Sequence, residues 1–239
     1  MYYYGGMGYY SSMIVLIPAM IFTMIVQARI NNAYRRYSQV ENSHRLTGAQ
    51  AARMMLDANG LSSVPIQILN GGDNLNNYYN PADNTVNLSR GVYQTDSVAS
   101  ICIACHEVGH AIQHATGYAP IKVRNAIVPL VNLTSRFSWP LIMLGLIFST
   151  TSRYGSLMFN LGALCFVFVI LFHLVTLPVE LNASNRALKQ MSALGIVNDM
   201  DYSGSKKVLH AAAMTYVAAL ATAVASLIRI LLMRGNDNR

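Results

Sequence analysis

An apolar run, Leu157–Leu177, constrains the fold of this chain more than any other feature, because His173 is its one ionisable side chain. As an α-helix the run would extend for about 30 Å, the thickness of the hydrocarbon core of a bilayer. Three other apolar runs are each ended by charge or by Asn, Ser and Gly: Ser12–Gln27, Phe137–Thr150 and Ala211–Ile228. These runs predict a mainly α-helical integral membrane protein with about four transmembrane helices.

The composition agrees with a membrane protein, since 53% of the residues are hydrophobic, 11% are charged and the mean hydropathy is +0.33. We interpret the first run as a retained anchor, because its leader carries no Lys or Arg and no small-residue cleavage site follows it. A buried core helix is the alternative. The second run is short, and it could extend back toward Ala126 or be re-entrant.

Basic residues predict the orientation in a cell membrane. Many of them fall in segments 28–136 and 178–207: Arg29, Arg35, Arg36, Arg45, Lys122, Arg124, Arg136, Arg186, Lys189, Lys206 and Lys207. By the positive-inside rule these segments face the cytosol, although arginines near the C-terminus act against this orientation. The formal charge of +7 is then a topology signal with attraction to an anionic leaflet. The sequence has no basic helix with interleaved aromatic residues, the pattern that would indicate nucleic-acid binding.

The spans divide the chain into five segments. Residues 1–28 hold the leader and first span, 29–136 a cytosolic portion, 137–177 the second and third spans, 178–207 a second cytosolic segment, and 208–239 the fourth span and tail. In the cytosolic portion, Thr47 and Gln50 predict the capping box of a helix that stops at Gly60. Val64–Leu69 and Thr85–Ser89 are predicted strands, joined by a turn-rich connection. This portion is therefore expected to be α+β.

A second predicted helix of the cytosolic portion carries the pattern HExxH, and Thr95, Asp96 and Ser97 offer N-cap side chains ahead of it. His106 and His110 are four residues apart, so both imidazoles lie on one helix face and can bind one zinc ion. Glu107 can take a proton from water that zinc activates and pass it to the leaving amine of a peptide bond. The alternative is two surface histidines beside a solvated glutamate. Gly109 favours the metal site, because a mid-helix glycine is explained by close packing.

A zinc site of this kind needs a third protein ligand. His114 lies about 12 Å along the helix from His106, too far for three rings of a straight helix to converge. The metzincin pattern fails, because it requires Gly and His where the chain has Gln113 and Thr116. His173 stays a candidate, since ionisable residues inside spans are often functional, but a lone histidine there is more often a packing residue.

Glu180 is the third ligand that topology favours. It follows the third span directly, and two membrane crossings separate it from His110. An even number of crossings returns the chain to the side where the histidines lie, so Glu180 can reach a zinc ion bound there.

Several segments together resemble the YugP-type neutral zinc metallopeptidases, small bacterial membrane proteins with several spans: "YYNPADNTVNLSRGVYQTDSVASICIACHEVGHAIQ", "CHEVGHAIQHATGYAP", "PVELNASNRAL" and "KKVLHAAAMTYVAALA". The resemblance extends from about Arg45 to Leu227. It implies a zincin-like extramembrane portion with a gluzincin arrangement. His106, His110 and Glu180 would then bind zinc, and Glu107 would be the base.

The resemblance also implies residues around the metal. Related membrane proteases carry an Asp four residues after the ligand Glu, and that Asp orients a zinc-bound His. Ser184 holds this position here, with Asn182 and Asn185 as neighbouring candidates. A hydroxyl could hydrogen-bond an imidazole, but it would raise the basicity of the ring less than a carboxylate does.

Two further assignments concern substrate. In zincins the strand before the active-site helix commonly binds substrate as an added strand, a role that here falls to Thr85, Val86, Asn87 and Leu88, with an ordinary edge strand as the alternative. His210 and Tyr216 are candidates for the donor that an oxyanion needs, and a structural role is the alternative for each.

We therefore expect a zinc-dependent membrane protease that cleaves membrane-associated proteins or peptides at the cytosolic surface. A membrane scaffold with a structural zinc site is the rival from a different class, and four closed protein ligands would support it. A latent enzyme, opened by a regulatory membrane partner, is the second rival.

Overall fold

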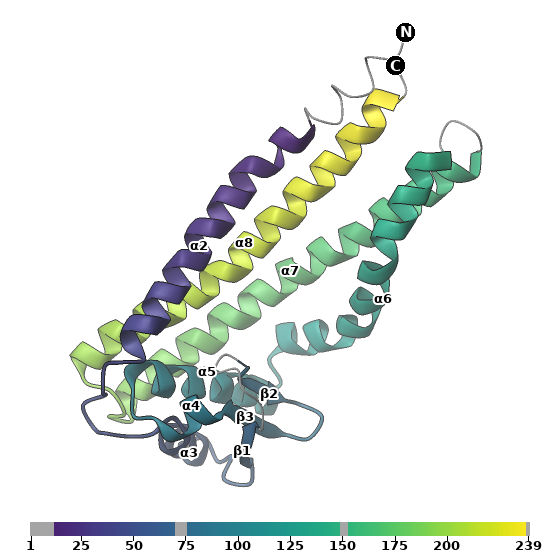
Figure 1. Ribbon diagram of the computed structural model, residues 1–239. Coiled ribbons are helices and arrows are strands. Elements are labelled where there is room, and N and C mark those ends of the chain that lie inside the picture. The colour runs from purple at the N-terminus through teal and green to yellow at the C-terminus, as the bar shows by residue number, and fades with distance from the viewer. Residues whose placement is uncertain (1–11, 70–75, 149–152, 238–239) are drawn as a thin grey trace. The chain divides into compact units, whose positions relative to one another are not determined.

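Long helices account for most of the chain in the computed structural model, which describes residues 12–69, 76–148 and 153–237 (Figure 1). The elements in chain order are α2 (Leu16–Tyr37), α3 (Gly48–Ala58), β1 (Ile66–Leu69), β2 (Tyr78–Asn80), β3 (Thr85–Ser89), α4 (Arg90–Gln94), α5 (Val98–Ala115), α6 (Ala119–Phe148), α7 (Arg153–Ala193) and α8 (Asp199–Asp237). The leader expected ahead of the first span falls, as residues 1–11, outside the described residues.

Among the described residues, four helical segments are long and apolar enough to cross a membrane: Ser12–Tyr37, Ala119–Phe148, Arg153–Ala193 and Asp199–Arg234. Only 11% to 28% of their most apolar windows is buried within the protein. Large apolar side chains such as Met24 and Ile147, 69% and 61% exposed, therefore face outward, which suits contact with lipid rather than water. The expectation of a mainly α membrane protein with a small α+β part is confirmed.

Three of these helices begin earlier than their apolar runs, α7 by only one turn and the other two by several turns. The second run was expected from Phe137, with an extension toward Ala126 or a re-entrant segment as alternatives, and α6 is one continuous helix from Ala119 that contains Pro129 and Pro140. The fourth run was expected from Ala211, but α8 begins at Asp199. Apolar runs mark the part of a helix that suits lipid, and polar turns extend the same helix beyond them.

The chain forms two compact units. The helical unit comprises Met1–Val26, Val123–Leu177 and Thr215–Arg239, and the α+β unit comprises Gln27–Lys122 and Pro178–Met214. All four divisions fall inside helices α2, α6, α7 and α8.

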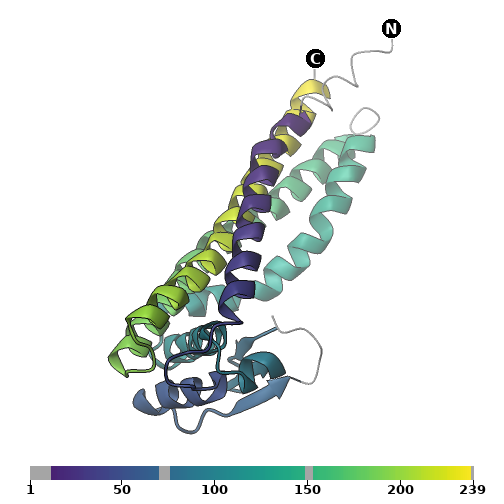
Figure 2. The same cartoon turned by 60° about the vertical axis from the view of Figure 1, so that its left-hand side comes forward.

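Small and hydroxyl-bearing residues join the helices of the helical unit. The Thr23 hydroxyl of α2 lies 3.1 Å from the Thr222 hydroxyl of α8, and these two helices run side by side in both views (Figures 1 and 2). A Cβ atom on Gly145 would lie 2.5 Å from the backbone nitrogen of Phe159, so α6 and α7 approach closely there. Such packing is typical of membrane helices, which associate through small residues.

The sheet of the α+β unit has the strand order β1-β3-β2. β3 is parallel to β1, with Val86 opposite Ile66, and antiparallel to β2, with Val86 opposite Tyr79. β2 lies within the stretch predicted to be a turn-rich connection, so the prediction from the sequence did not include this strand. β3 is thus the middle strand, and β2 is at one edge.

Local signals position the two helices that pack beside this sheet. Thr47 and Gln50 form the predicted capping box at the start of α3. Ser97 caps α5 by accepting a hydrogen bond from the Ser100 N–H. α5 ends in a Schellman motif, in which Gly117 has φ 65° and the Tyr118 N–H donates to the Gln113 carbonyl at 2.9 Å. The core between these elements includes completely buried Met55, Leu88, Ile101, Val108 and Met191.

Candidate metal centre

One face of α5 meets α7 within the α+β unit. His106, Gly109, His110 and Gln113 share this face, because their spacing repeats with the turn of the helix. A Cβ atom on Gly109 would lie 2.7 Å from the carbonyl oxygen of Ala183. The missing side chain therefore lets the two backbones approach, which is the close packing that the mid-helix glycine indicated.

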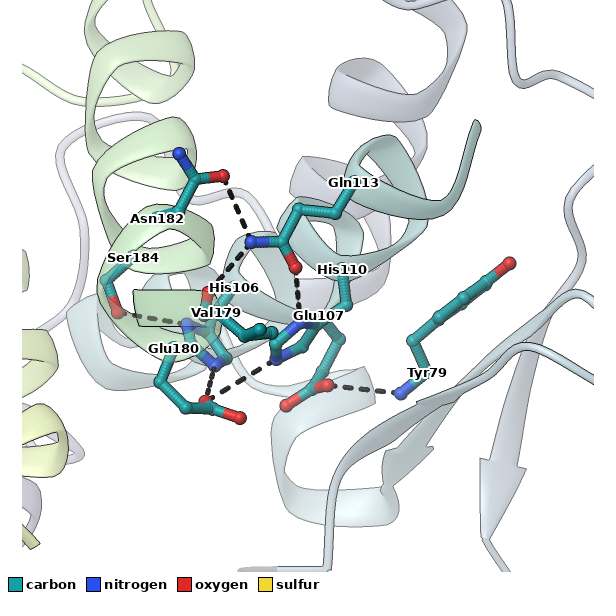
Figure 3. Close-up of polar contacts among 9 residues, drawn as sticks. All are labelled: Tyr79, His106, Glu107, His110, Gln113, Val179, Glu180, Asn182 and Ser184. Atoms are coloured by element: carbon teal, nitrogen blue, oxygen red, sulfur yellow. Dashed lines mark hydrogen bonds and ion pairs between the residues drawn. The ribbon is translucent and has the colours of Figure 1, made fainter. Parts of the chain in front are cut away.

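The close approach brings three candidate ligands together (Figure 3). Glu180 Oε2 lies 3.3 Å from His106 Nε2 and 3.5 Å from His110 Nε2. The ligand atoms of the three residues all lie within 4.8 Å of one another. Two imidazole nitrogens and a carboxylate oxygen are a donor set that zinc binds in proteins, so these residues fit a zinc ion.

The Nδ1 atom of each imidazole, which faces away from Glu180, also has a polar partner. His106 Nδ1 lies 3.2 Å from the Ser184 hydroxyl. His110 Nδ1 lies 3.0 Å from Gln113 Oε1. In metal sites such outer contacts fix which ring nitrogen is left to bind the metal. Both partners here are neutral groups.

Glu107 lies beside the ligands and points toward the sheet. Its side chain is 8% exposed, and its Oε2 accepts a hydrogen bond of 3.1 Å from the Tyr79 N–H of β2. Burial raises the pKa of Glu107, while the two imidazoles and the Tyr79 N–H act in the opposite direction. A raised pKa makes this carboxylate a better proton acceptor at neutral pH.

The electrostatics of the site favour a cation beside Glu180. Burial acts to lower the pKa of His110, but the hydrogen bond and the negative charge of Glu180 outweigh it, and the pKa is raised. A buried carboxylate thus stabilises positive charge at the His110 imidazole. A divalent cation supplies such charge without protonation of the rings.

Some of the predicted residues gather at this site and others do not. Asn182 Oδ1 accepts hydrogen bonds from Gln113 at 3.0 Å and from Arg186 at 2.8 Å. His114 points elsewhere, with Nδ1 2.6 Å from the Tyr79 hydroxyl. His210 is exposed on α8 in the α+β unit, whereas His173 and Tyr216 belong to the helical unit. The oxyanion roles of His210 and Tyr216 stay predictions, as does any role of Asn185.

The predicted contact of β3 with substrate stays a prediction, but β3 is not an edge strand. Thr85, Val86, Asn87 and Leu88 were expected to accept a substrate as an added strand. β3 is paired with β1 on one side, and its residues Thr85–Asn87 are paired with β2 on the other, so these residues offer no open edge to an added strand. The order of strands in the sheet differs from their order in the chain, and pairing of this kind cannot be read from one strand alone.

Sequence reasoning missed two residues of this site, Gln113 and Tyr79. Gln113 is three residues after His110 and seven after His106, so a helical projection would have placed it beside both rings. Tyr79 contributes a backbone N–H, which no pattern of side chains reveals.

Comparisons with known proteins find a family and a relative that match most of the chain. The sequence model of a family described as "putative neutral zinc metallopeptidase" matches residues 12–235. A protein of Bacillus subtilis (strain 168), described as "Putative membrane protease YugP", is 38% identical over 224 residues, which cover 92% of this chain and 96% of that protein. No solved structure matches the chain.

Proposed function

The chain belongs to the neutral zinc metallopeptidase family, and we propose that it is a multi-pass membrane protease that hydrolyses peptide bonds with a zinc ion held by His106, His110 and Glu180. The convergence of the three ligand atoms beside Glu107 is the observation that carries this proposal. Among the described residues the ligand group has three members, which leaves a coordination position for reaction, as catalytic zinc sites require.

When bound, zinc supplies a Lewis acid that activates water and polarises the scissile carbonyl. Glu107 is the base in this proposal. Its Oε2 is held by the Tyr79 N–H, and we assign proton transfer to its Oε1. Glu107 takes a proton as the water oxygen bonds to the carbonyl carbon, and it delivers that proton to the nitrogen as the C–N bond breaks.

The position of Glu180 suggests the class of substrate. Glu180 is two residues beyond Pro178, where the third apolar run ends and α7 continues into the α+β unit. We therefore propose that the substrates are membrane-associated proteins or peptides rather than free cytosolic chains. The basic residues of segments 28–136 and 178–207 support a cytosolic location of the centre. A regulatory membrane partner that opens the site is compatible with this location.

Replacement of Glu107 by Gln tests the proposed reaction. The variant keeps the size of the side chain and removes the base, so it should bind one zinc ion per chain and lose cleavage of a peptide and membrane-protein library. Glu41→Gln makes the same chemical change at an exposed glutamate and should leave cleavage unchanged. If wild type and Glu107→Gln bind zinc equally and neither cleaves any member, the zinc site is structural and the protein is a scaffold.

A further inference from the structure

We infer that Gln113 is the positioning residue of this centre: it selects the metal-binding nitrogen of His110 and fastens α5 to the part of α7 that carries Glu180. Its side chain is completely buried. The inference rests on the proposed zinc centre, and it assigns to one amide two tasks that the ligands themselves cannot perform.

The contacts of Gln113 with α7 fix how its amide group is turned. Nε2 donates to the backbone carbonyl of Val179 at 2.8 Å and to Asn182 Oδ1 at 3.0 Å (Figure 3). A carbonyl oxygen can only accept, so the NH₂ group must face α7. Both of its N–H donors are then used, and the amide oxygen is directed toward α5.

The direction of the amide oxygen determines the tautomer of His110. Gln113 Oε1 can only accept, so His110 Nδ1, at 3.0 Å, must carry a proton and donate it. The neutral ring then keeps its lone pair on Nε2, the atom that lies 3.5 Å from Glu180 Oε2. A backbone carbonyl of α7 thus sets, through Gln113, which nitrogen of His110 is available to a metal.

Ser184 cannot perform this task for His106 in the same way. A hydroxyl can donate or accept, so the contact of 3.2 Å with His106 Nδ1 is compatible with either tautomer. Gln113 therefore selects one tautomer of its histidine, whereas the Ser184 hydroxyl selects neither. Its two contacts with α7 flank Glu180 in the sequence, so the same side chain also holds the third ligand in place.

The test compares zinc dissociation constants, measured by chelator competition, for the full-length protein in detergent. Gln113→Met keeps the length of the side chain and removes all three hydrogen bonds. We expect it to bind zinc about 10- to 100-fold more weakly than wild type, the range seen when outer partners of metal ligands are removed. Gln113→Glu keeps an acceptor for His110 but loses both donors, so it should recover part of the lost affinity.

Gln190→Met is the matched control, because Gln190 also lies on α7 in the α+β unit and exchanges side-chain hydrogen bonds with Asn59. It should bind zinc as wild type does, even if thermal unfolding of its zinc-free form shows an equal loss of stability. Unchanged affinity of Gln113→Met would overturn the inference. Equal weakening by Met and Glu would overturn the selection of the His110 nitrogen. Wild type that binds no zinc would instead contradict the proposed centre itself.

The visible absorption of the cobalt-substituted protein gives a second readout. We expect the spectrum of Gln113→Glu to be closer to that of wild type than the spectrum of Gln113→Met is, because His110 of Gln113→Glu still binds through Nε2. If Gln113→Met does not fold, Gln113→Glu and the control still decide the matter: wild-type zinc affinity of Gln113→Glu would contradict the fastening of α5 to α7 by the two donors.

Discussion

The backbones of Gly109 and Ala183 meet so closely that a Cβ atom on Gly109 would lie 2.7 Å from the Ala183 carbonyl oxygen. Gly109 lies between the two histidines in the sequence, and Ala183 is three residues after Glu180. The contact therefore sets the separation between the two helices that supply the proposed ligands. Because Gly109 has no Cβ atom, the two helices can approach closely enough for their ligands to share one ion.

Gly109→Ala should weaken zinc binding and destabilise the protein. Alanine is favoured over glycine inside a helix by about 1 kcal/mol, so helix propensity alone predicts a gain in stability. Overpacking against a backbone oxygen costs about 1–3 kcal/mol, because no flexible side chain can move aside. Thermal unfolding of the zinc-free protein and chelator competition measure both effects. Ala115→Ser adds one atom on the exposed part of the same helix and should change neither. A more stable Gly109→Ala variant with normal affinity would contradict the packing described.

Glu180→Ala should lower zinc affinity by more than 100-fold, since loss of a ligand exceeds the effect of losing an outer contact. His114→Ala should leave the affinity unchanged, because His114 contacts the Tyr79 hydroxyl. Chelator competition on the purified variants measures both. Strong weakening by His114→Ala with normal binding by Glu180→Ala would mean that the third ligand has been chosen wrongly.

Cys102 and Cys105 should resist alkylation in the folded protein. Both are completely buried, and burial raises the pKa of Cys105 to about 12. Burial raises the pKa of Cys102 as well, with a further contribution from Cys105. At pH 8 only about one Cys105 thiol in ten thousand would then be the reactive thiolate. Mass spectrometry of a Cys165→Ala variant should show no adduct with iodoacetamide before unfolding and two adducts after it. Rapid reaction of the folded protein would show that this core is open.

The orientation in the membrane can be tested with two engineered thiols in the Cys165→Ala background. Met200 of the α+β unit is 80% exposed, and Tyr154, in the first turn of α7, is 70% exposed. With an impermeant maleimide, Tyr154→Cys should react in intact cells and Met200→Cys only after the cells are permeabilised. The reverse pattern would place the centre outside the cytosol. Equal labelling of both in intact cells would place the two thiols on one side of the membrane, so that α7 would not cross it and the two crossings between His110 and Glu180 would be contradicted.

The features that follow from neighbouring residues were predictable, and those that depend on distant partners were not. The capping box of Thr47 and the Ser97 cap involve residues three positions apart, so a local pattern reveals them. β2 lies in an Asn-rich stretch that reads as a turn. It is a strand because β3 pairs with it, and the hydrogen bond of Tyr79 reaches Glu107, 28 residues away.

The candidate site likewise contains residues that local patterns predicted and one residue that they did not. HExxH is local, and the topology of the spans was enough to single out Glu180 as a partner, which the structure brings next to both histidines. Gln113 was missed because its partners, Val179 and Asn182, are 66 and 69 residues away in the sequence. A helical projection places Gln113 beside both rings, but the contacts that fix its amide group cannot be inferred until the opposite helix is known.

X-ray absorption at the zinc K-edge tests the central claim most directly, because it reports the atoms around the metal in the full-length protein. A first shell of nitrogen and oxygen alone is predicted, with outer scattering from two imidazoles and a position filled by solvent. Sulfur in the first shell, a third imidazole, or four protein ligands with no solvent would contradict a catalytic centre built from His106, His110 and Glu180.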